Sequence, residues 1–182
     1  MKKSYHILAT GFEEMEAIAV VDVLRRGGVD VQTVSILEKR EVTSAHGVTV
    51  VADLLLDEVE AENAECLIFP GGMPGAQNLG GCQPLIGLMQ NHYNKGRHIA
   101  AICAAPALVL SHLDAGRKLR LTCYPGFEKF LPDVQVVADG TVVDGKVITG
   151  KGPGFAVQFG LTILEQIRSA KVAKEVAEGM LL

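Results

Sequence analysis

The chain has 182 residues, a length typical of one domain, and 48% of them are hydrophobic. A formal net charge of −4 with 21% charged residues excludes both a disordered chain and a strongly basic nucleic-acid-binding protein. There is no Trp, so aromatic platforms for base stacking are scarce. We predict one globular domain over residues 1–182 that binds no nucleic acid.

Neither a membrane span nor a secretion signal is predicted. The longest uncharged apolar run covers 12 residues, 99–110, and contains Pro106, whereas a bilayer span needs about 20 residues. The first residues include two lysines but no apolar run behind them. The densest basic cluster, Arg117-Lys118-Leu119-Arg120, is short and is interpreted as a solvated turn.

The four cysteines stand at positions 66, 82, 103 and 123 and form no C-x-x-C pair. This spacing excludes the common zinc and dithiol motifs, so no metal site is predicted. Free cysteines of this kind are typical of a reducing compartment, and we expect a cytoplasmic protein.

Strand-like and helical patterns alternate along the chain. The first strand is predicted at 4–9, and a helix follows from Glu13 to the glycines at 27–28, with Ile18, Val21 and Leu24 on one face. Further strands are predicted at 29–36, 41–43, 48–51, 66–69, 98–102 and 119–122, and a hairpin region at 134–137, 141–143 and 146–149. Further helices are predicted at 84–93, from Cys103 through 113, at 155–167 and at 171–180.

This alternation predicts an α/β fold in which helices cover both faces of a largely parallel sheet. Ligands of such sheets bind outside the carboxyl ends of the strands. Three segments fall at those ends: the acidic run 13–16, the Pro-Gly-Gly run 70–72, and Cys103. They are the candidate site.

Cys103 stands in Ala101-Ile102-Cys103-Ala104-Ala105, where a strand becomes a helix and small residues flank the cysteine on both sides. This pattern is typical of a nucleophile elbow, a sharp turn that exposes the sulfur while the helix N-terminus stabilises a thiolate. The alternative is a buried structural cysteine in an alanine-rich segment.

Gly71 and Gly72 can turn their N–H groups toward the same place and, with the N–H of Ala104, form an oxyanion hole. Alternatively, Pro-Gly-Gly is only a turn. The acidic run contains Glu13, Glu14 and Glu16. Either all three are helix-capping or solvated carboxylates, or one of them points at the sulfur and has a raised pKa.

Four motifs occur together in a characteristic order: 11–16 (GFEEME), 70–72 (PGG), 101–106 (AICAAP) and 152–154 (GPG). By these motifs the chain resembles the ThiJ/PfpI superfamily over its whole length, and within it the branch of the Parkinsonism-associated protein deglycase and its bacterial relatives. The resemblance implies a flavodoxin-like three-layer α/β sandwich and a homodimer.

The resemblance also implies roles for particular residues. Cys103 matches the reactive nucleophile, and Glu16 matches a protonated glutamate that hydrogen-bonds the sulfur. Gly72 and Ala104 match the backbone donors. Pocket residues by the same comparison are Tyr124, Gly71, Gly152 and Pro153.

The chain departs from the family pattern in its histidines. Tyr124 stands where the deglycase branch often has a histidine, and Ala104 stands where the peptidase-like branch has one. No Cys–His pair is therefore predicted, and a peptidase is disfavoured. His46 stands where the family often has an arginine and is interpreted as an ordinary surface residue.

Two hypotheses follow. The first is a cofactor-independent enzyme acting on small reactive carbonyls, either a glyoxalase III-like conversion of 2-oxoaldehydes to hydroxy acids or protein deglycation, with Cys103 as nucleophile and Glu16 as proton carrier. The second is a redox sensor or stress chaperone in which Cys103 is oxidised to a sulfinate held by Glu16.

Overall fold

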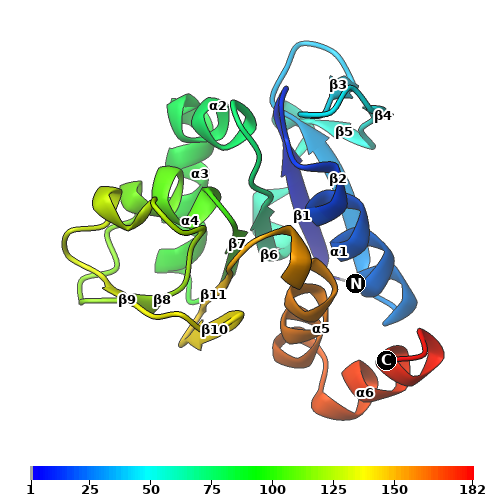
Figure 1. Cartoon of the computed structure of the whole chain (residues 1–182). Helices are drawn as coiled ribbons and strands as arrows, with labels where there is room; N and C mark the ends of the chain where they lie inside the picture. Colours follow the sequence, from blue (N-terminus) through cyan, green and yellow to red (C-terminus); the bar gives the residue numbers. More distant parts are fainter. Residues whose placement is uncertain (1) are drawn as a thin grey trace.

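Seven strands form the central sheet of the computed structural model, which describes residues 2–182 (Figure 1). They are β1 (Lys3–Leu8), β2 (Asp30–Ser35), β5 (Leu54–Leu55), β6 (Ala64–Phe69), β7 (His98–Ile102), β10 (Thr141–Asp144) and β11 (Val147–Gly150). Their order across the sheet is β10-β11-β7-β6-β1-β2-β5. All neighbours are parallel except β10 and β11, which form an antiparallel hairpin.

Helices cover both faces of this sheet, as Figure 1 shows. On one face lie α1 (Glu14–Arg26) and α5 (Ala156–Ile167), with α6 (Ala170–Gly179) packed against α5. On the other face lie α2 (Gly75–Gly81), α3 (Gln83–Asn94) and α4 (Ala105–Leu108). The predicted three-layer α/β sandwich with a mostly parallel sheet is confirmed.

Two small sheets lie outside the central one. The strands β3 (Glu41–Thr43) and β4 (Thr49–Val51) are antiparallel, whereas β8 (Arg120–Leu121) and β9 (Gln135–Val136) are parallel. The prediction that 134–137 belongs to the hairpin region is therefore wrong. The Asp144-Gly145 turn joins only β10 to β11, and β9 pairs with β8 instead.

Close packing joins the helices α1 and α5. A methyl group at Gly160 of α5 would lie 3.0 Å from Val23 Cβ of α1, and one at Gly27 would clash with Leu164. The predicted apolar face of α1 is wrong in one position, because Ile18 is half exposed while Glu16 is fully buried. A carboxyl group therefore lies on the inner face of this helix, where an apolar side chain is expected.

The helix that follows Cys103 is much shorter than predicted. It ends at Leu108 and is followed by a separate 3₁₀ turn at Leu110–His112. A four-residue helix contributes little macrodipole, so its start is a weaker site for a negative charge than the sequence predicts. The sequence also gives no signal for α2, whose three glycines disfavour a helix in isolation.

Within residues 2–182, no helix is both long and apolar enough to cross a membrane. The basic cluster that the sequence places near residue 118 is a surface feature whose arginines are ion-paired. Arg117 pairs with Asp144 at 2.9 Å and Arg120 with Asp139 at 2.8 Å. These pairs account for the cluster as a solvated turn.

Candidate active site

Cys103 occupies a sharp turn directly after β7. Its φ of +66° lies in the left-handed region, which non-glycine residues adopt uncommonly and at a cost of about 1–3 kcal/mol. The turn is fixed on both sides: the Cys103 N–H donates to Gly150 O at 2.9 Å, and the Tyr124 N–H donates to Cys103 O at 2.8 Å. The backbone therefore has the geometry of a nucleophile elbow, and the residue is 9% exposed.

Glu16 lies next to this elbow, in the first turn of α1. Its side chain is fully buried, and Oε2 accepts a hydrogen bond of 2.7 Å from the Gly71 N–H. Its other oxygen, Oε1, has no hydrogen-bond partner among residues 2–182. Apart from the neighbouring Cys103 thiol, the carboxyl is held by this one donor, in a setting where an ionised acid is costly.

Gly71 lies against both the Glu16 carboxyl and the Cys103 sulfur. A methyl group placed on Gly71 would lie 2.5 Å from Cys103 Cβ, 2.9 Å from Cys103 Sγ and 2.8 Å from Glu16 Oε2. Any side chain at this position would occupy the space that the two reactive groups share. Glycine is therefore required here to leave room for the site.

Burial controls the protonation of this pair. It raises the pKa of Glu16 to about 7, against the smaller opposing effects of the Gly71 N–H and the Cys103 thiol. Burial, and after it the negative charge of Glu16, raises the pKa of Cys103 to about 12, while the N–H groups of Gly72 and Ala104 lower it. The sequence-based prediction of an acidic thiol is therefore wrong, because burial and then the neighbouring carboxyl raise the pKa of Cys103 instead of lowering it. At pH 7 the Glu16 carboxyl is therefore about half ionised, while the Cys103 thiol keeps its proton.

Gly72 and Ala104 supply the backbone donors next to the sulfur, since both N–H groups lower the pKa of the thiol. Gly72 has a φ of +87°, and a methyl group there would lie 2.4 Å from Glu13 N and 2.6 Å from Gly11 O. Only glycine fits both this φ and this contact. The turn after β6 is thereby held against the turn after β1.

Tyr124, Gly152 and Pro153 lie together, with other loop residues, around a separate small hollow of about 220 Å³. A methyl group on Gly152 would meet the Tyr124 ring at 3.2 Å. This hollow adjoins the elbow through the hydrogen bond from the Tyr124 N–H to Cys103 O. Three of the predicted pocket residues thus form the outer surroundings of the elbow, and Gly71 forms the inner contact.

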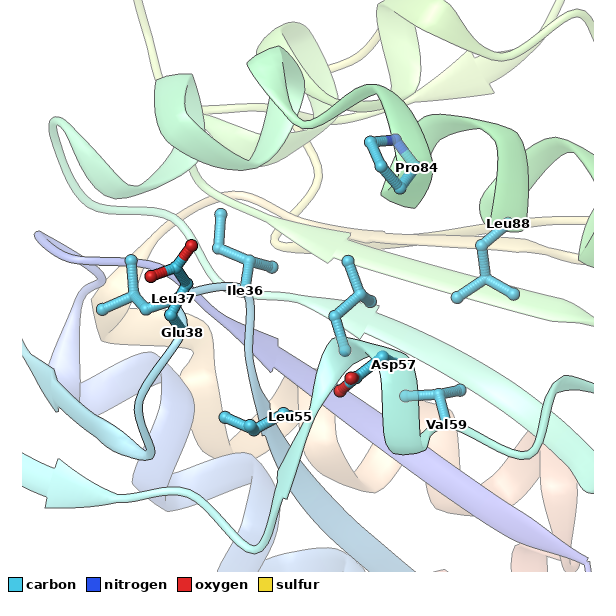
Figure 2. Close-up of a pocket in the computed structure, with 9 residues that line it drawn as sticks. Ile36, Leu37, Glu38, Leu55, Asp57, Val59, Pro84 and Leu88 are labelled. Carbon is cyan, nitrogen blue, oxygen red and sulfur yellow. The ribbon is translucent and has the colours of Figure 1, made fainter.

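A larger hollow, of about 560 Å³, lies away from the elbow (Figure 2). Apolar side chains from the end of β2, from the segment after β5 and from α3 surround it, among them Ile36, Leu56 and Leu88, and the acidic side chains of Glu38 and Asp57 lie at its sides. None of the predicted site residues lines it. Pocket size alone therefore does not locate the candidate active site.

The sequence did not single out one polar cluster at the start of α1. His46 Nδ1 lies 2.9 Å from Glu14 Oε1 and 3.7 Å from Glu13 Oε2. This is the one group of potential metal-ligating side chains found among residues 2–182, with ligand atoms within 4.8 Å of one another. The hydrogen bond between His46 and Glu14 accounts for this cluster without a metal ion, and it carries no metal assignment.

The remaining thiols have different surroundings. Burial raises the pKa of Cys123 to about 11 and that of Cys66 still further, and neither lies beside a buried carboxyl. Cys82 is half buried, and all four cysteines are free. Only Cys103 therefore combines a strained turn, backbone donors and a neighbouring acid.

Comparisons with known proteins agree with this geometry. The model of the DJ-1/PfpI family matches residues 2–166. Protein DJ-1 homolog B of Arabidopsis thaliana is 37% identical over 177 residues, covering 97% of this chain and 40% of that protein. Protein dj-1beta of Drosophila melanogaster is 36% identical over 183 residues, covering 100% of this chain and 97% of that protein. The chain spans less than half the length of the Arabidopsis relatives that it matches.

A further relative has a name that states an activity: the glutathione-independent glyoxalase DJR-1.2 of Caenorhabditis elegans, 33% identical over 173 residues, covering 93% of this chain and 90% of that protein. Among solved structures, oxidized DJ-1 of Toxoplasma gondii superposes with a TM-score of 0.93 at 36% identity, covering 100% of this chain and 98% of that chain. The matched region contains β1, the elbow and the turn after β6, so the fold and the family agree. The chain belongs to the DJ-1/PfpI family.

Proposed function

We propose that this protein is a cysteine-dependent enzyme that acts on small reactive carbonyls. The observation that carries the proposal is the buried pair of the Cys103 thiol and the Glu16 carboxyl, which lies beside the N–H groups of Gly72 and Ala104. A group with a pKa of about 7 can accept and return a proton at neutral pH. The naming of a relative as a glutathione-independent glyoxalase supports a 2-oxoaldehyde as substrate.

The proposed reaction begins when Cys103 Sγ attacks the aldehyde carbon of a 2-oxoaldehyde such as methylglyoxal. The thiol proton passes to the Glu16 carboxylate, and a C–S bond forms as the carbonyl becomes an alkoxide. The N–H groups of Gly72 and Ala104 stabilise this oxyanion. Protonation of the alkoxide then gives a hemithioacetal.

Glu16 next moves a proton from the former aldehyde carbon to the neighbouring ketone carbon, through an enediol. The first carbon is oxidised to a thioester and the second is reduced to an alcohol, so no external oxidant or reductant is needed. Water then cleaves the thioester, releasing lactate and restoring the thiol. Removal of an early glycation adduct from a protein amine would use the same nucleophile and the same proton carrier.

The test is lactate formation from methylglyoxal by the purified protein. Cys103→Ser is expected to reduce kcat/KM by about a thousandfold or more, because the nucleophile is lost. Cys82→Ser, at a half-buried thiol outside the site, is the matched control and should retain full activity. Equal activity in Cys103→Ser and the unmodified protein would show that the thiol is not the nucleophile.

A second function uses the same residues in a redox sensor or stress chaperone. The resemblance to an oxidized DJ-1 structure favours it, and the geometry offers the Glu16 carboxyl as a hydrogen-bond donor to a Cys103 sulfinate. Glu16→Gln keeps a donor but cannot carry a proton. If Glu16→Gln loses turnover but still forms the sulfinate under mild peroxide, the result supports the enzyme. If Glu16→Gln behaves like the unmodified protein and only Glu16→Ala is defective, the result supports the sensor.

Two further parts of the proposal concern assembly and location. We propose a homodimer, supported by half-exposed apolar side chains on α1 and β4, and a reducing, cytoplasmic location, supported by four free cysteines. A reducing location would keep the Cys103 thiol in the reduced form that turnover requires.

A further inference from the structure

A small polar hollow lies at the amino-terminal end of β7, whereas Cys103 lies at the carboxyl end of that strand. The hollow has a volume of about 230 Å³, and Lys2, Arg97, His98 and Lys146 line it together with Glu65. His98 is the first residue of β7, whereas Cys103 follows the last residue of that strand. The two sites are therefore separated by the full length of β7.

Positive charge dominates this hollow, although the chain as a whole has a net charge of −4. Its acid, Glu65, is already neutralised, because both of its oxygens accept hydrogen bonds of 3.0 Å from the guanidinium of Arg168. Arg97 is held in place by the carbonyls of residues 61 and 62, and its guanidinium lies 3.8 Å from the exposed Glu62 carboxylate, which does not line the hollow. The charges of Lys2, Arg97 and Lys146 therefore exceed those of the acids that line the hollow.

The contact between His98 and Lys146 supports this interpretation. Lys146 Nζ lies 3.3 Å from His98 Nε2, so the ammonium can donate a hydrogen bond to the unprotonated ring nitrogen. Burial, followed by the charge of Lys146, lowers the pKa of His98, while Glu65 raises it; His92, which lies close by, is buried with a pKa lowered to about 4. An anion bound beside Lys146 would offset the lysine charge and so favour a proton on His98.

We propose that this hollow binds a small dianion, a phosphate group, through Lys2, Arg97 and Lys146, with His98 taking up a proton as the anion binds. The size agrees with this ligand, because pockets for drug-sized molecules are about 300–1,000 Å³ and this one is smaller. Arginine and lysine together are the usual partners of phosphate. The site is distinct from the candidate active site, and its test does not depend on turnover.

The probe is inorganic phosphate, titrated at constant ionic strength and followed by NMR of the amides of Gly96, Arg97 and Lys146 and of the His98 ring. Phosphate is expected to shift these signals with saturation and to raise the His98 pKa toward its ordinary value. The amides of Gly72 and Ala104 should not move. Lys146→Gln is expected to weaken phosphate binding about fivefold or more, because one unit charge at contact is lost.

Lys39→Gln is the matched control, since it removes one exposed lysine far along the chain in the β2–β3 connection, and it should bind phosphate like the unmodified protein. Chloride and acetate at the same ionic strength test for simple screening. If they shift the signals as much as phosphate does, or if Lys146→Gln binds phosphate unchanged, the assignment of a phosphate site is overturned. Signals near Gly72 and Ala104 that move instead would place the anion at the candidate active site and equally overturn the proposal.

Discussion

The Glu16 carboxyl binds a proton more tightly in the folded protein than in the unfolded chain, because burial raises its pKa from 4.5 to about 7. Its contribution to stability is therefore fully present below pH 4.5 and is lost as the pH rises through 7. A shift of this size corresponds to a loss of about 3 kcal/mol at pH 8.5. The residue proposed to carry the proton is thus also one that destabilises the fold at alkaline pH.

Glu16→Gln is expected to raise the free energy of unfolding at pH 8.5 by about 2–3 kcal/mol and to change it little at pH 4.5, because the amide oxygen can still accept the Gly71 N–H while the charge is gone. Urea unfolding at the two pH values measures this difference. Glu165→Gln, on the exposed side of α5, is the control and should show no such pH-dependent gain. A gain at pH 4.5 as large as that at pH 8.5 would mean that Glu16 is not a proton-binding group.

His6, in the middle of β1, has the opposite pH dependence. It is fully buried, and burial lowers its pKa to about 3. The ring therefore stays neutral in the folded protein at pH values below about 6.5, where the unfolded chain binds a proton. Stability is therefore lost as the pH falls from 6.5 toward 3. Neither ring nitrogen has a hydrogen-bond partner among residues 2–182, so no acceptor offsets this effect.

The free energy of unfolding should fall between pH 7 and pH 4.5 as the unfolded chain binds a proton at His6. His6→Leu is expected to make this fall about 2–3 kcal/mol smaller, because no group at this position then gains a proton on unfolding. The difference in urea-unfolding free energy between the two pH values measures it. His112→Leu, at an exposed histidine, is the control. An unchanged pH dependence in His6→Leu would show that this histidine is solvated or hydrogen-bonded in solution.

At the scale of elements, two turns lock the site together. The turn after β1 and the turn after β6 exchange backbone hydrogen bonds: Glu13 N–H donates to Gly71 O at 3.0 Å, and Gly75 N–H donates to Gly11 O at 3.1 Å. Glu16 and the backbone donors therefore reach the sulfur from separate elements. The position of each depends on the close approach at Gly72.

Gly72→Ala is expected to destabilise the protein by about 3 kcal/mol or more and to reduce carbonyl activity sharply, because the methyl group would clash with Glu13 N and Gly11 O at a φ of +87°. Gly28→Ala is the matched control: its φ is +71°, but nothing lies within 4 Å of the added methyl group. It should cost only the conformational strain, about 1 kcal/mol. Equal effects of the two substitutions on stability and activity would contradict the proposed role of the contact.

At the scale of the whole molecule, several exposed apolar side chains lie on α1 and on the hairpin of β3 and β4 beside it. Met15 is 60% exposed, Ile18 48% and Val51 69%. The hairpin of β3 and β4 packs through Val42 against Phe12 and Ala17 at the start of α1. An apolar surface of this kind is typical of an interface between protein chains.

Ile18→Glu is expected to convert the proposed homodimer into monomers without loss of fold, because it places a charge in the apolar surface of α1. Light scattering after gel filtration distinguishes the mass of one chain from that of two. Val143→Glu, at a partly exposed apolar position on β10, is the control and should remain dimeric. A monomeric unmodified protein, or a dimeric Ile18→Glu protein, would contradict this assignment of the interface.

The sequence by itself determined the features that depend on neighbouring residues: the alternation of strands and helices, the elbow at Cys103 and the glycines after β6. Local backbone requirements, such as a small residue beside a tight turn, are visible in the residues themselves. The tertiary structure decided the features that depend on distant contacts. Glu16 and Gly71 are 55 residues apart, and only folding buries that carboxyl beside the thiol, while leaving Ile18 outside. The raised pKa values of the pair follow from this burial, which the acidic run 13–16 by itself left open, because the same residues are also suited to be solvated helix caps.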